Sequence, residues 1–468
     1  MSSEISRVKP VFHAALCGKK SGFDACHIAL IRQAIDESEE LQKAKLNVEG
    51  IKKMVEIVEE FLARKKLICY GGTAINNLLP KNAQFYDKDT QIPDYDFFSP
   101  TPLEDAKELA DIYFKAGFAE VEAKTGVHHG TFKVFVDYTP MADITYMHPA
   151  LFRRLMRDSV SVLGIHYCPP DFLRMNMYLE LSRPAGDVSR WEKVAGRLLL
   201  LNEHRPMISK KCGALASRAR VDARAELIRT ELVGQGAVFL GGYAADLYIR
   251  KATSGGGSAR PALCFDAICA EHKKAAEIIR ERLREAGAKA VDVVSHPEFA
   301  ETLPAHSEVR VGGRPVAVLY QPVACHNYNE IEVDGAAMRV ATIDTMMNFY
   351  LALYYTGRPG SDAERVLCMA QFLFDLSQRR LDDSGLLKRY STSCYGVQPT
   401  LSDMRTEKTL KKRDPALKKG TVEYEMWFLQ YSPGSSAKGT TKKNAASPTA
   451  ARKKRRRAKK TRRVRFFS

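Results

Sequence analysis

The hydrophobic pattern of the first third of the chain changes between helical and strand-like periods. Apolar residues recur at helical spacing from Val48 to Lys66, and the apolar run Leu67–Tyr70 that follows is typical of a buried strand. This run ends at Gly71-Gly72-Thr73, where the pattern predicts the start of a new helix. Three more strands and one helix are expected, at 94–98, 131–137, 142–146 and 102–117. This order predicts an α/β unit of roughly 100 residues.

The same landmarks recur farther along the chain at nearly one offset. Gly241, Asp266 and Gly287 each lie 170 positions after a matching residue, namely Gly71, Asp96 and Gly117. Segments 138–143 and 320–325 share Tyr-x-Pro-x-Ala, and segments 176–181 and 348–353 share Asn-x-Tyr-Leu-x-Leu. We interpret residues 46 to about 185 and 220 to about 360 as two copies of one unit. Chance agreement between two generic helix-strand-helix units is the alternative.

The basic charge of the chain is concentrated near its end. The formal net charge is +17, and the residues from Lys438 onward contain 14 Lys and Arg without any Asp or Glu. The rest of the chain is therefore close to neutral. From about Ser432 the composition is poor in large apolar residues, which predicts a disordered tail. Such a tail attracts polyanions without sequence preference.

Cysteine usage and hydropathy limit the class of protein. The ten cysteines form no CxxC pair and match no histidine cluster of zinc spacing, so we expect reduced thiols in a cytosol-like compartment. No apolar stretch of about 18 residues occurs, and the first residues lack the apolar core of a signal peptide. A soluble intracellular protein without membrane contact is expected.

Three carboxylates of the first unit form a candidate metal site. Asp94 and Asp96 lie two residues apart on an expected strand, so both side chains point to one side while Tyr95 points into the core. Asp143 on a later strand is our choice for the third ligand, with Asp137 as the rival. Hard oxygen ligands of this kind fit Mg²⁺ or Mn²⁺ better than zinc. Two such ions commonly neutralise charge at a reacting phosphorus during nucleotidyl transfer.

Gly71, Gly72 and Thr73 form a candidate phosphate site at the start of a helix. Two glycines let the backbone approach a ligand closely, and the free amides at a helix start attract anions. Thr73 can add a hydroxyl donor. A Gly-Gly pair alone is usually a tight turn, and an Asp-x-Asp pair alone is usually a solvated strand edge. Their order along the chain, followed by a later Asp, favours the catalytic interpretation.

The second copy lacks the complete set of carboxylates. The repeat offsets place Cys264, Cys325 and Leu319 at the positions of Asp94, Asp143 and Asp137, and only Asp266 remains. One carboxylate cannot hold two metal ions. We therefore expect the second copy to be catalytically silent and to serve as structure or as an RNA-binding surface.

Four long strings resemble a known family. They are CYGGTAINNLLP (69–80), IPDYDFFSP (92–100), VHHGTFKVFVDYTPMADITYM (127–147) and LRMNMYLELSRPAGDVSRWEKV (173–194). They are similar to the catalytic poly(A) polymerase subunit of large nucleocytoplasmic DNA viruses, a group with mimivirus-like, asfarvirus-like and, more distantly, poxvirus enzymes. The resemblance is densest over residues 67–205. Asp94 lies 22 positions after Gly72, a gap that departs from the family pattern and indicates an insertion beside the active site.

The resemblance implies a template-independent polynucleotide adenylyltransferase of the DNA polymerase β-like nucleotidyltransferase superfamily. In that family pattern, residues 71–73 bind phosphate, and Asp94, Asp96 and Asp143 bind two divalent ions and carry catalysis. ATP and the RNA 3′ end, that of viral mRNA, are the implied substrates, and the virion and host cytoplasm are the implied location. A homodimer and a separate viral processivity subunit both stay open. The alternatives are a nucleotidyltransferase acting on another acceptor and a non-catalytic RNA-binding subunit.

The predicted fold class is α/β (α+β), with two tandem nucleotidyltransferase-like domains, helical connectors and a disordered basic tail. The expected parts are an N-terminal segment (1–45), a catalytic domain (46–150), a helical connector (151–215), an inactive second domain (216–360), a helical or irregular segment (361–431) and the tail (432–468). RNA binding by the tail is assigned to Lys453, Lys454, Arg455, Arg456, Arg457, Lys459 and Lys460. A nuclear localisation signal and a general electrostatic tether are the alternatives for this tail.

Overall fold

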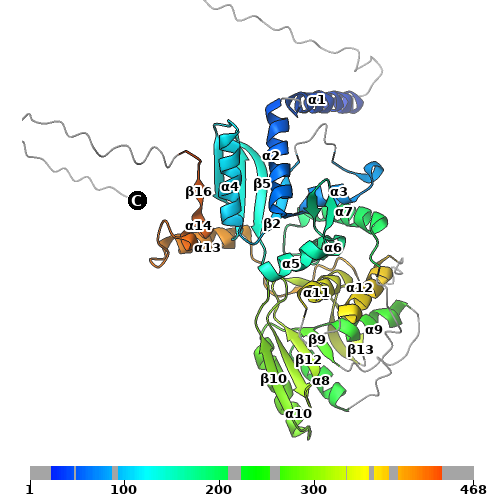
Figure 1. Cartoon of the computed structure of the whole chain (residues 1–468). Coiled ribbons are helices and arrows are strands. Elements are labelled where there is room, and N and C mark those ends of the chain that lie inside the picture. The colour runs from blue at the N-terminus through cyan, green and yellow to red at the C-terminus, as the bar shows by residue number, and fades with distance from the viewer. Residues whose placement is uncertain are drawn as a thin grey trace, which may run out of the picture.

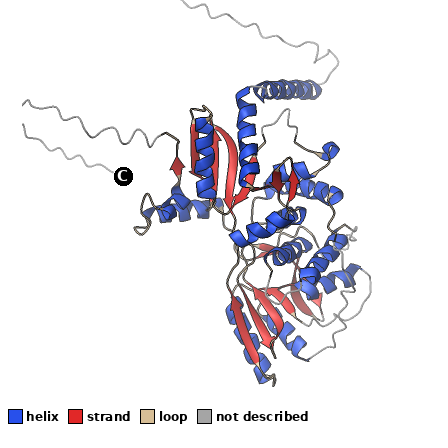
Figure 2. Cartoon of the chain, in the orientation of Figure 1, coloured by secondary structure: helices blue, strands red, loops and turns tan. Residues whose placement is uncertain are grey.

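Two mixed β-sheets with flanking helices make up the described part of the chain (Figure 1 and Figure 2). The computed structural model describes residues 23–46, 49–86, 93–208, 223–252, 264–333, 335–357, 363–378 and 388–434. The basic cluster between Lys453 and Lys460 lies outside these residues, so its RNA-binding role stays a prediction. None of the described helices has the length and apolar character that crossing a bilayer requires.

The first unit is built around an eight-stranded sheet in the order β16-β3-β4-β5-β2-β1-β7-β6. Its strands are β1 (Ile68–Tyr70), β2 (Tyr95–Ser99), β3 (Val121–Thr125), β4 (Thr131–Val136), β5 (Thr139–Tyr146), β6 (Val160–Val162), β7 (Ile165–Tyr167) and β16 (Gln430–Tyr431). Its helices are α1 (Phe23–Leu46), α2 (Glu49–Lys65), α3 (Gly71–Leu78), α4 (Pro102–Lys115), α5 (Pro149–Asp158), α6 (Pro170–Leu181) and α7 (Trp191–His204), with short 3-10 turns at Lys81–Ala83 and Val188–Arg190.

Helix α2 packs on one face of this sheet and anchors the inward side of β2. The amphipathic pattern of α2 buries Phe61 against Phe97, with ring centroids 6.3 Å apart. The buried Tyr95 hydroxyl donates to Glu59 Oε1 at 2.5 Å. Because side chains alternate along a strand, Asp94 and Asp96 are directed away from this packed face. The layer of helices therefore fixes the orientation of the candidate carboxylates.

Residues 151–215 are only partly the helical connector that the sequence predicted. Strands β6 and β7 lie within this range, and β7 pairs in parallel with β1, so they complete the first sheet rather than link two domains. Each strand has only three residues, which is too short to show a period of two in the sequence. The sequence therefore predicted the helices of this segment but not its two short strands.

The second unit repeats the topology of the first. Its sheet has the order β10-β11-β12-β9-β8-β14-β13-β15. The strands are β8 (Val238–Leu240), β9 (Phe265–Ile268), β10 (Val291–His296), β11 (His306–Val311), β12 (Arg314–Tyr320), β13 (His326–Val333), β14 (Ala336–Ala341) and β15 (Cys394–Tyr395). The helices are α8 (Ala223–Gly234), α9 (Gly241–Ala252), α10 (His272–Glu285), α11 (Ile343–Thr356) and α12 (Ala363–Ser377).

Each of the first seven strands of one sheet has a counterpart in the other. The order β3-β4-β5-β2-β1-β7-β6 corresponds to β10-β11-β12-β9-β8-β14-β13, and every matched pair has the same parallel or antiparallel direction. The predicted fold class, a mixed α/β chain with two tandem units, is thereby confirmed. The residue boundaries assigned to the individual domains stay predictions.

The two units meet through matching helices. Helix α6 of the first unit lies against α11 of the second, and Asn348 of α11 donates to the Met175 carbonyl of α6 at 3.2 Å. Arg174 of α6 is fully buried at this junction. Its guanidinium donates to Asp171, to Asn202 Oδ1 at 2.9 Å and to the Leu201 carbonyl at 3.2 Å. A buried charge with this many partners ties α6 to α7 beside the second unit.

The segment after the second unit returns to the first sheet. It contains α13 (Leu401–Arg413) and α14 (Val422–Phe428), and β16 then pairs antiparallel with β3. Lys107 of α4 forms an ion pair with Glu425 at 2.7 Å, and the Tyr431 hydroxyl donates to Asp111 at 2.6 Å. The sequence predicted helical or irregular structure here but gave no sign that this segment completes the edge of the first sheet.

The expectation of ten reduced thiols was wrong for at least three cysteines. Cys325 and Cys394 form a disulfide with a Cα–Cα distance of 5.2 Å, and Cys368 is also disulfide-bonded. Residues 325 and 394 are 69 positions apart, so no local sequence motif indicated that they pair. They meet because β15 pairs with β13. Cys69, Cys168, Cys264 and Cys269 take part in no disulfide.

Replacing Arg174 should strongly destabilise the fold. Arg174→Ala leaves the partly buried Asp171 without its counter-ion, so we expect the free energy of unfolding to fall by about 3–5 kcal/mol. Arg64→Ala is the matched control, since the Arg64–Glu108 pair is exposed and should contribute no more than about 1 kcal/mol. Urea unfolding followed by circular dichroism measures both. Equal losses in the two variants would contradict the role given to Arg174.

Candidate active site

A close approach between Gly71 and Asp96 defines the floor of the candidate site. Gly71 is the first residue of α3 and has a φ of +72°, a left-handed conformation that glycine adopts readily. A β-carbon at this position would overlap Asp96 Oδ2. Strand β1 pairs with β2 so that Tyr70 lies opposite Asp96. The first glycine is therefore required for the turn and for the space occupied by the carboxylate.

The sheet register brings the predicted carboxylates together. Asp96 on β2 is the direct neighbour of Asp143 on β5 in a parallel pair, so the two side chains lie on the same face. Asp94 directly precedes β2 and is exposed, while Tyr95 between them is buried. The expected alternation along this strand is therefore present. Asp94, Asp96 and Asp143 share one side of the sheet.

Asp137, the rival for the third position, lies elsewhere. Asp137 and Tyr138 both have positive φ, 48° and 64°, and form the exposed two-residue turn between β4 and β5. The Asp137 amide donates to the Glu120 carbonyl at 2.8 Å. The register therefore favours Asp143, since it places that residue beside Asp96 and leaves Asp137 at the end of the hairpin.

Lys133 is a member of the site that sequence reasoning missed. It lies opposite Asp143 in the β4–β5 pair, and its ammonium forms an ion pair with Asp143 Oδ2. Only the pairing register shows this neighbour, because Lys133 sits in an ordinary alternating strand. Lys133 supplies a positive charge where the three carboxylates crowd.

Burial and neighbouring negative charge raise the pKa of two of the carboxyls, Asp94 and Asp96. Burial, with the charges of Asp94 and Asp143 added, raises the pKa of Asp96 to about 7, although Lys133 and Arg190 act in the opposite direction. Burial and Asp143 also raise the pKa of Asp94. Three carboxylates on one face of the sheet are a suitable binding set for a divalent cation, which would offset the repulsion between their charges. The donor chemistry thus fits Mg²⁺ or Mn²⁺, and Asp94, Asp96 and Asp143 are the residues that would hold it.

Thr73 has a different local role from the one expected. Its hydroxyl donates to the Asp94 carbonyl at 2.7 Å, and the residue is buried. The side chain thus fixes the entry to β2 from the first turn of α3. In this arrangement the hydroxyl acts on the position of Asp94, and the phosphate contact expected from the sequence stays a prediction.

Gly72 faces a second group that the sequence did not single out. A β-carbon there would lie 2.5 Å from the Tyr86 hydroxyl and 3.0 Å from Arg197 Nη1. Arg197 of α7 donates to that hydroxyl at 2.5 Å and stacks over Phe85, with 4.8 Å from its guanidinium carbon to the ring centroid. The described part of the insertion after α3 is thus packed against an arginine beside the helix start. The combination provides a positive surface at the glycine turn.

The second unit keeps the glycine geometry and loses the carboxylates. Gly241 has a φ of +75°, and a β-carbon there would overlap Asp266 Oδ2, as at Gly71 and Asp96. In the register, however, Val318 is the neighbour of Asp266. The sequence alignment of Cys325 with Asp143 was therefore wrong, because Cys325 follows β12 and belongs to a disulfide. Different loop lengths before and after β12 caused this shift.

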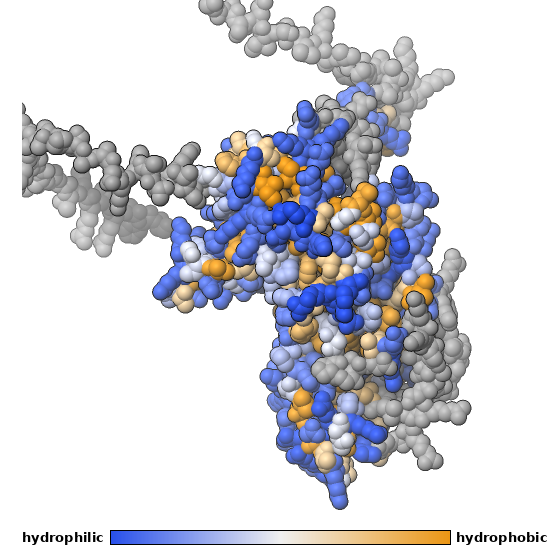
Figure 3. All heavy atoms as spheres, in the orientation of Figure 1, coloured by the Kyte–Doolittle hydropathy of each residue, from blue (hydrophilic) through white to orange (hydrophobic). Residues whose placement is uncertain are grey.

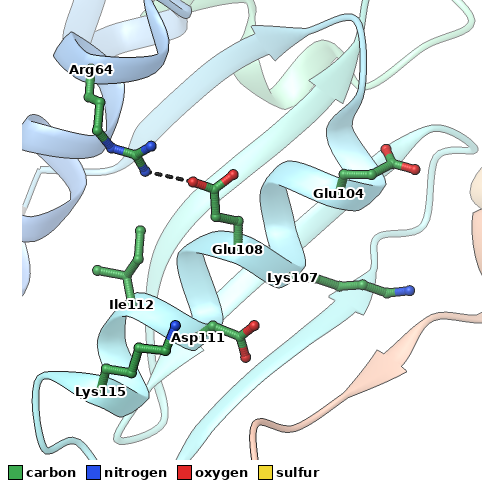
Figure 4. A pocket seen from close by; sticks show the side chains of 7 residues that line it. All are labelled: Arg64, Glu104, Lys107, Glu108, Asp111, Ile112 and Lys115. Atoms are coloured by element: carbon green, nitrogen blue, oxygen red, sulfur yellow. Dashed lines mark hydrogen bonds and ion pairs between the residues drawn. The ribbon is translucent and has the colours of Figure 1, made fainter.

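A separate hollow of about 590 Å³ lies on α4 (Figure 4). Its walls carry both signs of charge, and Arg64 and Glu108 pair across it at 2.7 Å. The lining residues are Arg64, Glu104, Lys107, Glu108, Asp111, Ile112 and Lys115. None of the predicted site residues lines this hollow, so it carries no part of the candidate chemistry.

The raised pKa of Asp96 predicts a pH-dependent cost to stability. Since this pKa is about 7 in the fold and near 3.8 for an ordinary carboxyl, ionised Asp96 destabilises the metal-free fold once the pH exceeds about 4, and fully above 7. Asp96→Asn should therefore stabilise metal-free protein at pH 8, by at most about 4 kcal/mol, and have little effect at pH 4. Thermal unfolding in EDTA at both pH values measures this.

Asp137→Asn serves as the control for that experiment. Asp137 is exposed in a turn whose positive φ asparagine tolerates, so its replacement should change stability little at either pH. The quantity compared is the stability that Asp96→Asn gains over the unsubstituted chain. An equal gain at pH 8 and pH 4 would contradict the raised pKa of Asp96.

Comparisons with known proteins point to one family. Residues 56–187 match the family model described as "Poly(A) polymerase catalytic subunit". A putative poly(A) polymerase catalytic subunit of African swine fever virus (strain Badajoz 1971 Vero-adapted) is 34% identical over 172 residues, which is 36% of this chain and 36% of the viral protein. The protein of the same description from Acanthamoeba polyphaga mimivirus is 29% identical over 215 residues, 43% of this chain and 36% of that protein. The matches thus span about a third of the length of these relatives.

A solved structure extends the similarity in fold beyond this segment. The Megavirus polyadenylate synthase superposes with a TM-score of 0.74 and covers 91% of this chain and 88% of its own, at 19% identity. Both units described above therefore belong to a fold already known from that protein. The sequence match coincides with β1, α3, β2, β5 and the carboxylates they carry. Residues 56–187, which include these carboxylates, are thus similar to the poly(A) polymerase catalytic subunit family.

Proposed function

We propose that this chain is a polynucleotide adenylyltransferase that extends RNA 3′ ends, those of viral mRNA among them, with adenylate from ATP. The observation that carries the proposal is the convergence of Asp94, Asp96 and Asp143 beside a glycine turn inside the segment that matches the polymerase family. Two divalent ions, Mg²⁺ or Mn²⁺, would supply charge neutralisation at the α-phosphorus and activation of the attacking hydroxyl. The three aspartates would hold these ions.

The protein groups around the carboxylates suit a bound triphosphate. Gly72 lies in the first turn of α3, and the guanidinium of Arg197 lies beside it. Arg190, at the start of α7, is close enough to lower the pKa of Asp96 through its charge. Polyanionic phosphate would be attracted by the helix start and by both arginines. We assign Arg190 and Arg197 to orientation of the triphosphate, together with Gly71 and Gly72.

An arginine ridge on α5 is our candidate path for the RNA backbone. Arg153 and Arg157 are exposed one helical turn apart, and Arg154 lies over the Tyr354 ring at 5.0 Å. These arginines and Ala150 line a hollow of about 460 Å³. A strongly hydrophilic band crosses the molecule at the level of α5, between the two units (Figure 3). Since α5 follows β5 after two residues, the ridge is connected directly to the strand that carries Asp143.

Primer extension tests the proposed reaction and its site together. A labelled RNA ending in oligo(A) is incubated with each of the four nucleotides and Mg²⁺ or Mn²⁺. We expect long tails with ATP only, and a loss of at least about a hundredfold in rate for Asp94→Ala/Asp96→Ala because the charge-stabilising ligands are gone. Asp137→Asn should extend normally. RNA binding by the aspartate variant should persist.

Other outcomes would redirect the assignment. Tails of unchanged length from the double aspartate variant would contradict the site. RNA binding without any extension by the unsubstituted chain would favour a non-catalytic RNA-binding subunit instead.

The salt dependence of RNA binding tests the arginine ridge. The RNA-binding constant K falls as salt rises, and each phosphate contact adds about 0.7 to the steepness of this fall on a log–log plot for a single strand. The plot for Arg153→Ala/Arg157→Ala should therefore be less steep by about 1.4. Arg282→Ala/Lys289→Ala removes the same charge from exposed positions of the second unit and is the matched control. Fluorescence anisotropy at several salt concentrations gives both slopes. Equal slopes for the two double variants would rule out the ridge as an RNA path.

A further inference from the structure

The second unit carries different side chains on the face that corresponds to the catalytic face of the first. In the first unit this face presents Asp96, Asp143 and Lys133 on three adjacent strands. The matching register in the second unit reads Asp266, Val318 and Glu308. The third aspartate has become an apolar residue, and the lysine has become a carboxylate. The altered face therefore has a new acidic residue on β11, which is separated from the retained Asp266 on β9 by strand β12.

Two histidines lie next to this carboxylate. His296 and His306 are direct partners across the antiparallel β10–β11 pair, and Glu308 lies two residues after His306 on the same face. One ligand atom from each side chain lies within 4.8 Å of the other two. His296 Nε2 and Glu308 Oε1 are 3.7 Å apart, and the imidazole ring centroids are separated by 4.7 Å. The three side chains thus converge on one point.

The surroundings hold these side chains in place. His306 and Glu308 are buried, each with 2% of its surface exposed. His306 Nδ1 lies 3.0 Å from the Pro304 carbonyl, so a proton on Nδ1 would direct Nε2 toward the cluster. Arg310 donates to Glu308 Oε2 from Nε at 2.9 Å and from Nη2 at 2.6 Å. Such hydrogen bonds from outside are typical of oriented metal ligands.

We propose that His296, His306 and Glu308 bind a divalent transition-metal ion of the zinc class. Imidazole nitrogens favour such ions over Mg²⁺, and two histidines with one carboxylate leave a fourth position for water in a tetrahedral site. The side chain of His296 keeps 21% of its surface exposed, which gives the ion a route from solvent. The chain then holds two metal sites of different selectivity, an oxygen-only site in the first unit and a histidine-containing site in the second.

The bound ion would fasten an edge of the sheet near the junction of the two units. Strand β10 is the outermost strand of the second sheet, and His296 is its last residue. The loop after β10 contains Phe299, whose ring lies 5.0 Å from that of His148, the residue that caps α5. A metal bridge between β10 and β11 therefore stabilises the loop that contacts the first unit.

Metal binding to untagged full-length protein tests this site. Asp94→Ala/Asp96→Ala removes the oxygen site, and the remaining binding of Co²⁺ is followed by equilibrium dialysis and visible absorption. We expect about one Co²⁺ per chain with the absorption of a tetrahedral centre, displaced by Zn²⁺. Adding His296→Ala should weaken binding at least about tenfold. Adding His128→Ala instead replaces an exposed histidine outside the cluster and should leave binding unchanged.

A second readout needs no substitution in the cluster. His296 is accessible enough to react with diethyl pyrocarbonate, and mass spectrometry of the unsubstituted chain measures its modification with and without Zn²⁺. Zn²⁺ should slow modification of His296 and leave His128 unaffected. Equal modification of His296 with and without Zn²⁺, or equal Co²⁺ affinity of the His296→Ala and His128→Ala proteins, would overturn the proposal. Both readouts are independent of polymerase activity.

Discussion

The contact between a glycine backbone and a carboxylate determines the arrangement of the first unit. Gly71 turns the chain from β1 into α3 and leaves room for Asp96, so any larger residue would displace either the helix start or the acid. Gly241 and Asp266 repeat the geometry where the other carboxylates are gone. Because the second unit keeps this glycine without the full carboxylate set, we infer that the glycine is needed for the turn from strand to helix and not only for catalysis. Catalytic function then depends on what the neighbouring strands present to this turn.

Stability and proposed activity make opposite demands on the carboxylate face. Burial and the closeness of Asp94, Asp96 and Asp143 raise the pKa values of the first two, so the metal-free fold holds charge that it would be more stable without. Lys133 offsets part of this repulsion. Two sets of buried contacts hold such a site rigidly in place. Tyr95 and Phe97 of β2 pack against α2, and Arg174 bonds to Asn202.

The spacing of residues along the sequence was enough to predict much of the fold and the central residues of the candidate site. The Gly-Gly turn and the Asp94–Asp96 pair follow from strand periodicity, and the repeat offset revealed two tandem units. Properties that depend on register or on distant pairing were missed. Lys133 and Arg197 reach the site only through folding, β6 and β7 are too short to have a period, and the disulfide joins positions 69 residues apart. The misalignment of Cys325 shows how loop lengths mislead a sequence offset when no register is known.

The return of β16 to the first sheet has a consequence for biosynthesis. A ribosome delivers the chain from its N-terminus, so β3 emerges some 300 residues before the Gln430–Tyr431 strand that covers its outer edge. During that interval the edge backbone of β3 is open to pairing with other nascent chains. Folding of the first unit is therefore completed only after the entire second unit has been translated. Premature termination within residues 396–429 would leave the second sheet complete and expose only this edge of the first sheet.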